Sequence, residues 1–200
     1  MKEIENRGFA DDFSICLSII GAGVPVVGTF LTICCPSVFS PHVRIAWLLL
    51  LVWVIMVGAG SSILKLAFTS AFPTVQWLRR PHGACNCDPF NSDGYQGDNP
   101  GFPSGHCSIA ALYASVIVFF PIYEALLTSK WDFKRIVLSI VISCLIVCLT
   151  CRSRVEKRCH NWLQAIGGLI WGGFMGILFC LMISRFHKNE IKIENNSFLN

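Results

Sequence analysis

The sequence predicts an all-α fold, a polytopic membrane helical bundle of about five transmembrane helices. Charged residues make up 14% of the 200 residues, whereas an ordinary soluble domain carries about 25%. Hydrophobic residues make up 54% and the mean hydropathy is +0.58. The apolar residues lie in long uncharged runs rather than at the periods of amphipathic helices or strands. These observations exclude a disordered chain, a coiled coil and a typical soluble globule.

Five apolar segments reach, or nearly reach, the roughly 20 residues that a helix needs to cross the hydrocarbon layer of a bilayer. They are residues 13–35, 45–64, 107–127, 136–151 and 162–184. We expect helices rather than strands, because backbone polar groups in lipid must be hydrogen-bonded within the segment. The shortest segment is 136–151, and Trp131 and Phe133 extend it into the interface.

The crossings define the domain organisation and bring two polar connections together. We expect a short tail at 1–12, a membrane domain at 13–184 and a polar tail at 185–200. With five crossings, the long loop 73–106 and the basic connection 152–161 lie on one membrane face, and the polar tail lies on the other. A loop longer than about 15 residues is commonly functional or disordered.

Glycines recur on the last apolar segment, as Gly167-Gly168, Gly172-Gly173 and Gly176. Small residues at helical spacing are typical of a close helix–helix contact. Glycine is also simply frequent in membrane helices, and the sequence leaves both interpretations open.

Basic and nucleophilic residues collect in the two connections on the shared face. They are Arg79, Arg80, Ser104, His106, Arg152, Arg154, Lys157, Arg158 and His160. A guanidinium group matches phosphate geometry, and histidine transfers protons or attacks electrophiles near neutral pH. Gly105 precedes an expected helix, whose free N–H groups and dipole favour an anion. The pattern predicts a phosphate site at the membrane surface. Taken singly, the arginines also fit interfacial anchors or a positive-inside loop.

The combination resembles the type 2 phosphatidic acid phosphatase superfamily, whose pattern reads K-x6-R-P, then P-S-G-H, then S-R-x5-H-x3-D. Arg80-Pro81 matches the end of the first element, and residues 103–106 match the second in full. Ser153-Arg154 followed by His160 matches most of the third. The resemblance covers about half of the chain, from Lys65 to Gln164 with the flanking helices.

This resemblance implies a membrane phosphatase that uses no metal and no cofactor. His160 would attack phosphorus and become a phosphohistidine, and His106 would protonate the leaving alcohol. The phosphoryl oxygens would be held by Arg80, Ser104, Gly105 and Arg154. The substrate would be a lipid phosphate, either a phosphomonoester of the phosphatidate kind or an isoprenyl diphosphate.

The resemblance also implies a placement in the cell. The protein would be a multi-pass membrane protein with its active site on the lumenal or extracytoplasmic side, and the family commonly has six crossings where we count five. A formal net charge of +4 does not by itself suggest a nucleic-acid partner. Nothing in the sequence specifies an oligomeric state.

Two positions depart from the family pattern. The aspartate four residues after the nucleophilic histidine is Gln164 here, and the lysine position is Pro73, with Lys65 the nearest lysine upstream. Positions four apart share a helix face, so the Gln164 amide oxygen can accept a hydrogen bond from the His160 ring, although it supplies no charge. Lys65 is either a phosphate ligand or an interfacial charge, and Arg79 is a possible substitute for the lysine. The alternative function is therefore a catalytically impaired member of the fold that binds a lipid phosphate or serves as a structural membrane protein.

Cysteines in the two connections allow two interpretations. Cys85 and Cys87 with His82 form an incomplete zinc pattern, because a second pair of ligands is missing. On an extracytoplasmic face, a disulfide among Cys85, Cys87, Cys107 and Cys159 would close the long loop over the site. Cys107 and Cys159 each adjoin one of the two candidate catalytic histidines.

Overall fold

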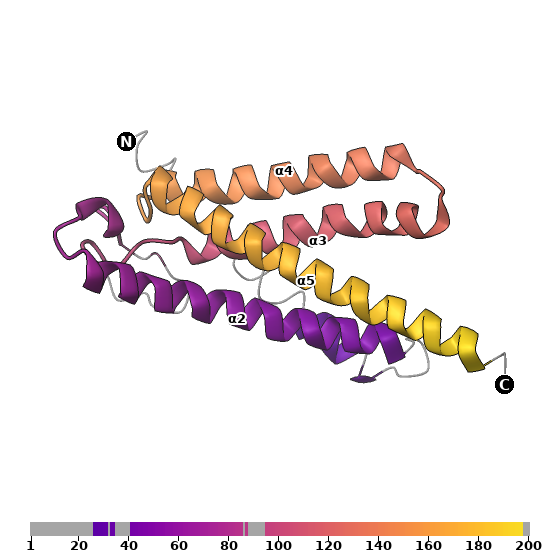
Figure 1. Ribbon diagram of the computed structural model, residues 1–200. Helices are drawn as coiled ribbons and strands as arrows, with labels where there is room; N and C mark the ends of the chain where they lie inside the picture. Colours follow the sequence, from indigo (N-terminus) through magenta and orange to yellow (C-terminus); the bar gives the residue numbers. More distant parts are fainter. Residues whose placement is uncertain (1–25, 32, 35–40, 86, 88–94, 198–200) are drawn as a thin grey trace.

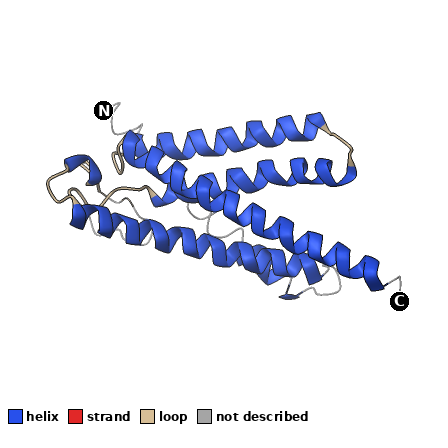
Figure 2. Ribbon diagram, viewed as in Figure 1, coloured by secondary structure: helices blue, strands red, loops and turns tan. Residues whose placement is uncertain are grey.

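The protein is a bundle of long helices, seen in a computed structural model that describes residues 26–31, 33–34, 41–85, 87 and 95–197 (Figure 1). The labelled helices are α2 (Pro41–Ala71), α3 (Gly105–Thr128), α4 (Phe133–Glu156) and α5 (Trp162–Ser197), and the short 3-10 helix η1 spans Gln76–Leu78. Figure 2 shows helices joined by loops, and the described residues form no strand. The predicted all-α membrane bundle is confirmed.

Four helices are long and apolar enough to cross a membrane within the described part of the chain. These segments are Arg44–Ala71, Gly105–Thr128, Phe133–Glu156 and Trp162–Phe186. At about 1.5 Å per residue, each exceeds the roughly 30 Å of the hydrocarbon layer. Residues 26–31 and 33–34 are also helical, but most of the predicted crossing at 13–35 lies outside the described residues.

The observed helices extend beyond the predicted apolar segments. α4 begins at Phe133 and ends at Glu156, so the first residues of the predicted connection 152–161 belong to a helix. The side chain of Asp132 caps the start of α4 by accepting a hydrogen bond from the Arg135 amide at 3.1 Å. Arg152 pairs with Glu156 one turn later at 2.6 Å. The end of the apolar segment therefore marks the first charged residue, Arg152, whereas the helix itself continues to Glu156.

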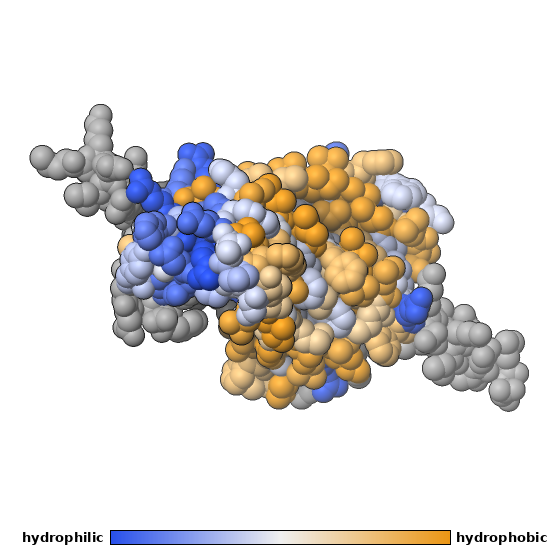
Figure 3. Space-filling view, turned by 60° about the vertical axis from the view of Figure 1, so that its left-hand side comes forward, coloured by the Kyte–Doolittle hydropathy of each residue, from blue (hydrophilic) through white to orange (hydrophobic). Residues whose placement is uncertain are grey.

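Large apolar side chains face outward along the helices. Ile55, Ile63 and Ile170 have 61%, 66% and 69% of their surfaces exposed. Figure 3 shows apolar residues over the helical body and hydrophilic residues gathered at one end. A water-soluble bundle rarely exposes such an extended apolar surface. The distribution therefore fits a protein that is surrounded by lipid along its length.

α3 and α5 run in parallel and approach each other closely, because glycines of α5 face small residues of α3. A Cβ atom added at Gly168 would clash with the Ser104 carbonyl, and one added at Gly172 would clash with the Ser108 backbone. A Cβ at Gly176 would lie 2.6 Å from the Cβ of Ser115. These three glycines therefore confirm the helix-contact interpretation, whereas Gly173 faces open space.

α2 runs antiparallel to α5 and completes the core. The indole nitrogen of Trp53 donates to the Met175 carbonyl at 2.8 Å, and that of Trp171 donates to the Val57 carbonyl at 3.3 Å. The buried cluster between α2, α3 and α5 consists of Val54, Val57, Leu112, Val116, Phe179 and Cys180. This packing places the end of α2 beside the beginnings of α3 and α5.

The contrast between neighbouring glycines predicts the effect of adding a methyl group to each. Gly172→Ala should destabilise the protein by about 1–3 kcal/mol, because the new Cβ overlaps backbone atoms of α3. Gly173→Ala is the matched control and should be neutral or stabilising by up to about 1 kcal/mol, since its Cβ meets no atom and alanine favours helix. Thermal unfolding in detergent measures both, and equal midpoints for Gly172→Ala and wild type would contradict this packing.

Candidate active site

The candidate site lies at one end of the bundle, where the two predicted connections meet. The long loop folds back on itself through isolated bridges between Arg79 and Pro100 and between Cys85 and Tyr95. It reaches α5 through a hydrogen bond of 3.0 Å from the Asn161 side chain to the Trp77 carbonyl. The predicted convergence of the two connections on one face is confirmed.

The connection between α4 and α5 is short and tightly turned, which places His160 beside the end of α4. Arg158 adopts a left-handed conformation with φ of 59°. The amides of Cys159 and His160 then both donate to the Arg154 carbonyl, at 3.1 and 3.3 Å. Because these bonds close the end of α4, Arg154 and His160 are held close together.

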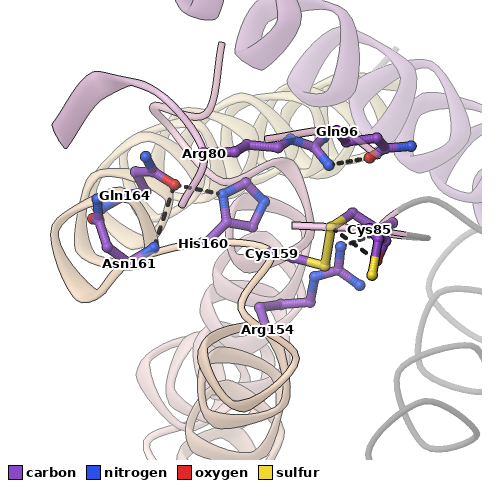
Figure 4. Close-up of a disulfide and its surroundings, with 9 residues drawn as sticks. Arg80, Cys85, Gln96, Arg154, Cys159, His160, Asn161 and Gln164 are labelled. Carbon is purple, nitrogen blue, oxygen red and sulfur yellow. Dashed lines mark hydrogen bonds between the residues drawn. A yellow bond between two sulfur atoms is a disulfide. The ribbon is translucent and has the colours of Figure 1, made fainter. Parts of the chain in front are cut away.

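His160 is hydrogen-bonded to Gln164 one turn into α5, as the four-residue spacing predicts. The ring Nδ1 lies 2.9 Å from Gln164 Oε1, and the two side chains are 2% and 0% exposed (Figure 4). Gln164 Nε2 donates to the carbonyls of Trp77 and Arg79 at 2.9 and 2.6 Å. These two acceptors fix the orientation of the amide, so Gln164 Oε1 must accept from His160 Nδ1–H. When the ring is neutral, the other ring nitrogen, Nε2, is then unprotonated.

The surroundings of His160 favour its neutral form. Burial lowers the pKa of His160 well below its ordinary value, and the positive charges of Arg154, Arg80 and Lys65 lower it further. The hydrogen bond to Gln164 opposes this shift. A histidine with a lowered pKa is unprotonated at neutral pH, and an unprotonated ring nitrogen is the nucleophilic form.

The beginning of α3 supplies donors for an anion. Ser104 is fully buried and precedes the helix, and its hydroxyl has no hydrogen-bond partner among the described residues. The Ser104 amide donates to the Gln164 carbonyl at 2.9 Å, which fixes the start of α3 against α5. Gly105 and His106 form the first turn of α3, and the His106 side chain is half-buried. The free amides of this turn favour a negative ligand.

Two buried arginines face the same region. Arg80 is 8% exposed and donates to Gln96 Oε1 at 2.5 Å, and Arg154 is 1% exposed and donates to the Cys87 carbonyl. Each of these acceptors is uncharged and orients its guanidinium group. In Figure 4, His160 lies between Gln164 and these two arginines.

Lys65 reaches the site from α2, although its position in the sequence does not match the family pattern. Its Nζ lies 4.0 Å from the position of a Cβ added at Gly105, and its charge contributes to the lowered pKa of His160. α2 continues to Ala71 and thereby carries Lys65 beside the start of α3. Arg79, the other candidate for the missing lysine, instead donates to the Asp98 carbonyl at 3.0 Å.

Comparison with known families gives one match. A family model described as the PAP2 superfamily matches residues 46–188, which is more than half of the chain. The chain belongs to the PAP2 superfamily. No curated protein and no solved structure matches it.

Membership of the PAP2 superfamily indicates a phosphatase-type function in a membrane helical bundle. The family match includes Lys65, both connections, α3, α4 and most of α5. The structure brings the predicted site residues Arg80, Ser104, Arg154 and His160 to the same end of the bundle, and the other two, Gly105 and His106, form the adjoining first turn of α3. It adds Lys65, which the sequence left open, to the same end of the bundle.

Gln96 and Asn161 belong to the site but were not predicted. Asn161 Oδ1 accepts from the Gln164 amide at 2.9 Å, while Gln164 Oε1 lies 3.3 Å from the Asn161 amide. This reciprocal pair is a capping box at the start of α5, and its sequence signature is readable in Asn161-Trp162-Leu163-Gln164. Gln96 carries no comparable signal, because its contact with Arg80 depends on how the long loop folds back.

A disulfide between Cys87 and Cys159 ties the long loop to the α4–α5 connection. Cys85 and Cys107 are free thiols, so the structure selects one pairing from the four predicted candidates. The bonded Cys87 sulfur is not available to a zinc ion. Cys87, Cys159 and Ala84 form a fully buried cluster, and the Cys87 carbonyl holds Arg154. The disulfide therefore fixes the loop beside both Arg154 and His160.

Removing this disulfide should lower stability. It closes a loop with a sequence separation of 72, and loss of such a bond costs about 2–5 kcal/mol. We expect Cys87→Ser to lower the thermal midpoint in detergent and to reduce phosphatase activity, because Arg154 loses its fixed acceptor. Cys85→Ser is the control, since Cys85 is a free, exposed thiol. Equal midpoints for the two variants would rule out this structural role.

Proposed function

We propose that this PAP2-superfamily protein hydrolyses a lipid phosphate through a phosphohistidine intermediate on His160. The substrate is a phosphomonoester of the phosphatidate kind or an isoprenyl diphosphate. The observation that supports this most strongly is the buried His160, whose Nδ1 is hydrogen-bonded to Gln164 and whose pKa is lowered by burial and by Arg154, Arg80 and Lys65 beside it. A cationic pocket that keeps its nucleophile neutral suits attack on a phosphate.

In the first step, His160 Nε2 attacks phosphorus while the bond from phosphorus to the leaving oxygen breaks. His106 donates a proton to that oxygen, so an alcohol or a monophosphate leaves. In the second step, water attacks the phosphohistidine, His106 takes the proton from the water, and inorganic phosphate is released. Each step is general acid–base catalysis combined with a covalent intermediate.

The remaining groups stabilise the charge on the transferring phosphoryl group. Positioned cations and backbone amides lower the barrier of phosphoryl transfer, because charge spreads over the three equatorial oxygens. Arg80, Arg154 and Ser104 supply buried donors, and the amides of Gly105 and His106 point along the axis of α3. Lys65 adds a positive charge from α2.

The position of the site supports a lipid substrate. The site lies at the hydrophilic end of a bundle whose sides are covered by apolar residues (Figure 3). A phosphate headgroup at the interface can therefore enter the site while its acyl or isoprenoid chain remains in the bilayer.

The disulfide between Cys87 and Cys159 supports an extracytoplasmic or lumenal orientation, because disulfides persist in oxidising compartments.

The alternative is a member of the fold that binds a lipid phosphate without hydrolysing it. The observation that favours it is Gln164, which places no negative charge beside His160. A binding protein would retain affinity for phosphatidate while releasing no phosphate, so turnover separates the two functions.

Removing the proposed nucleophile should abolish turnover. His160→Ala should reduce phosphate release from phosphatidate and from farnesyl diphosphate by more than about 1,000-fold, because no other group replaces a covalent nucleophile. His82→Ala is the control and should stay within about 2-fold of wild type, since His82 is exposed and pairs with Asp98 outside the site. Phosphate release by purified protein in mixed micelles measures both. Equal rates of phosphate release for wild type and His160→Ala would contradict the proposal that the protein is an enzyme.

A further inference from the structure

Gln164 makes a set of contacts that only an amide can make. Its nitrogen donates to the carbonyls of Trp77 and Arg79, and its oxygen lies within hydrogen-bonding distance of the His160 ring and the Asn161 amide. The side chain is fully buried. A carboxylate has no proton to donate, so it would leave two carbonyl oxygens facing a negative charge in a buried site.

The neighbouring loop is shaped to hold this longer side chain. A Cβ atom added at Gly101 would lie 2.7 Å from both Nε2 and Oε1 of Gln164. The Gly101 amide donates to the Leu78 carbonyl at 2.8 Å, which fixes the loop in this position. An aspartate at 164 is one methylene shorter and would not span the distance to His160, Trp77 and Arg79 together.

Gln164 thus joins two parts of the site that are far apart in the sequence. Through its oxygen it holds the His160 ring, and through its nitrogen it holds the backbone immediately before Arg80. The cations around His160 come from α4 as Arg154, from the long loop as Arg80 and from α2 as Lys65, and α3 contributes His106 in its first turn. Gln164 adds no charge to this set.

We propose that Gln164 is a positioning residue that acts specifically as an amide, and that it is not a defective replacement for a carboxylate. By donating to the Trp77 and Arg79 carbonyls it fixes its own oxygen toward His160 Nδ1–H. This leaves Nε2 as the nucleophile and sets the distance between the nucleophile and the loop that carries Arg80. The catalytic part of this inference rests on the proposed function, whereas the control of the His160 tautomer does not.

Three substitutions separate the roles of the amide. Gln164→Glu keeps the length, the capping box and an acceptor for His160, removes the two donors to the carbonyls and adds a negative charge. Gln164→Asp restores the family residue, and Gln164→Leu removes every hydrogen bond of the side chain. Leu163→Ala is the control, because Leu163 precedes Gln164 on α5, is 54% exposed and lies outside the site, so every hydrogen bond of the Gln164 side chain remains.

Kinetic measurements test the catalytic part. We expect Gln164→Leu to lower kcat about 100-fold, in line with the loss of a residue that orients a reacting group, with KM changed by less than about 3-fold. Gln164→Glu and Gln164→Asp should lower kcat by at least about 10-fold, and Leu163→Ala by less than about 3-fold. A kcat for either acidic variant that equals or exceeds that of wild type would overturn the proposal.

A second measurement tests the tautomer without relying on activity. ¹⁵N NMR of histidine-labelled protein, with the His160 signals assigned by loss in His160→Ala, should show the Nδ1–H tautomer in wild type. Gln164→Leu should lose this tautomer, and Leu163→Ala should keep it, in samples that retain the Cys87–Cys159 disulfide on non-reducing gels. An unchanged tautomer in Gln164→Leu would refute the inference. If wild type releases no phosphate, the proposed function fails, and the NMR result still decides the role of Gln164.

Discussion

The close parallel contact of α3 with α5 is the constraint on which the site depends. Gly168, Gly172 and Gly176 have no Cβ atom, so the backbone of α5 can approach α3 closely at these three positions. Because the helices are parallel, their first turns lie side by side at one end of the bundle. The contact continues past the glycines as the bond from the Ser104 amide to the Gln164 carbonyl. The anion-binding turn and the proposed nucleophile are therefore fixed relative to each other before any loop contributes.

Around this fixed pair, the site concentrates positive charge and excludes water. Arg80 and Arg154 are buried, and together with Lys65 and burial they keep His160 neutral. The same charges that disfavour an imidazolium favour a phosphate, so in the proposed mechanism one arrangement both keeps the nucleophile neutral and attracts the substrate. The disulfide and Gln164 then hold the long loop, which carries Arg80, against the helix ends.

Much of this arrangement could be predicted from the sequence, because it depends on local spacing and on the number of crossings. The four-residue spacing predicted the bond between His160 and Gln164, and the crossing count predicted the convergence of the two connections. Lys65 could not be placed, since it lies eight residues upstream of Pro73, which occupies the lysine position of the family pattern. The partner of Cys159 and the two carbonyl acceptors of Gln164 depend on how the long loop folds back, which no periodicity in the chain encodes.

The central claim is that phosphate passes through Nε2 of His160, and the chemical identity of the intermediate tests it most directly. Rapid quenching of the reaction with ³²P-labelled phosphatidate, followed by alkaline digestion and separation of the phosphohistidine isomers, identifies the bonded nitrogen. The account predicts an acid-labile phosphohistidine on His160 with phosphorus on Nε2. Phosphate release without a trapped phosphohistidine, or phosphorus on Nδ1, would contradict it.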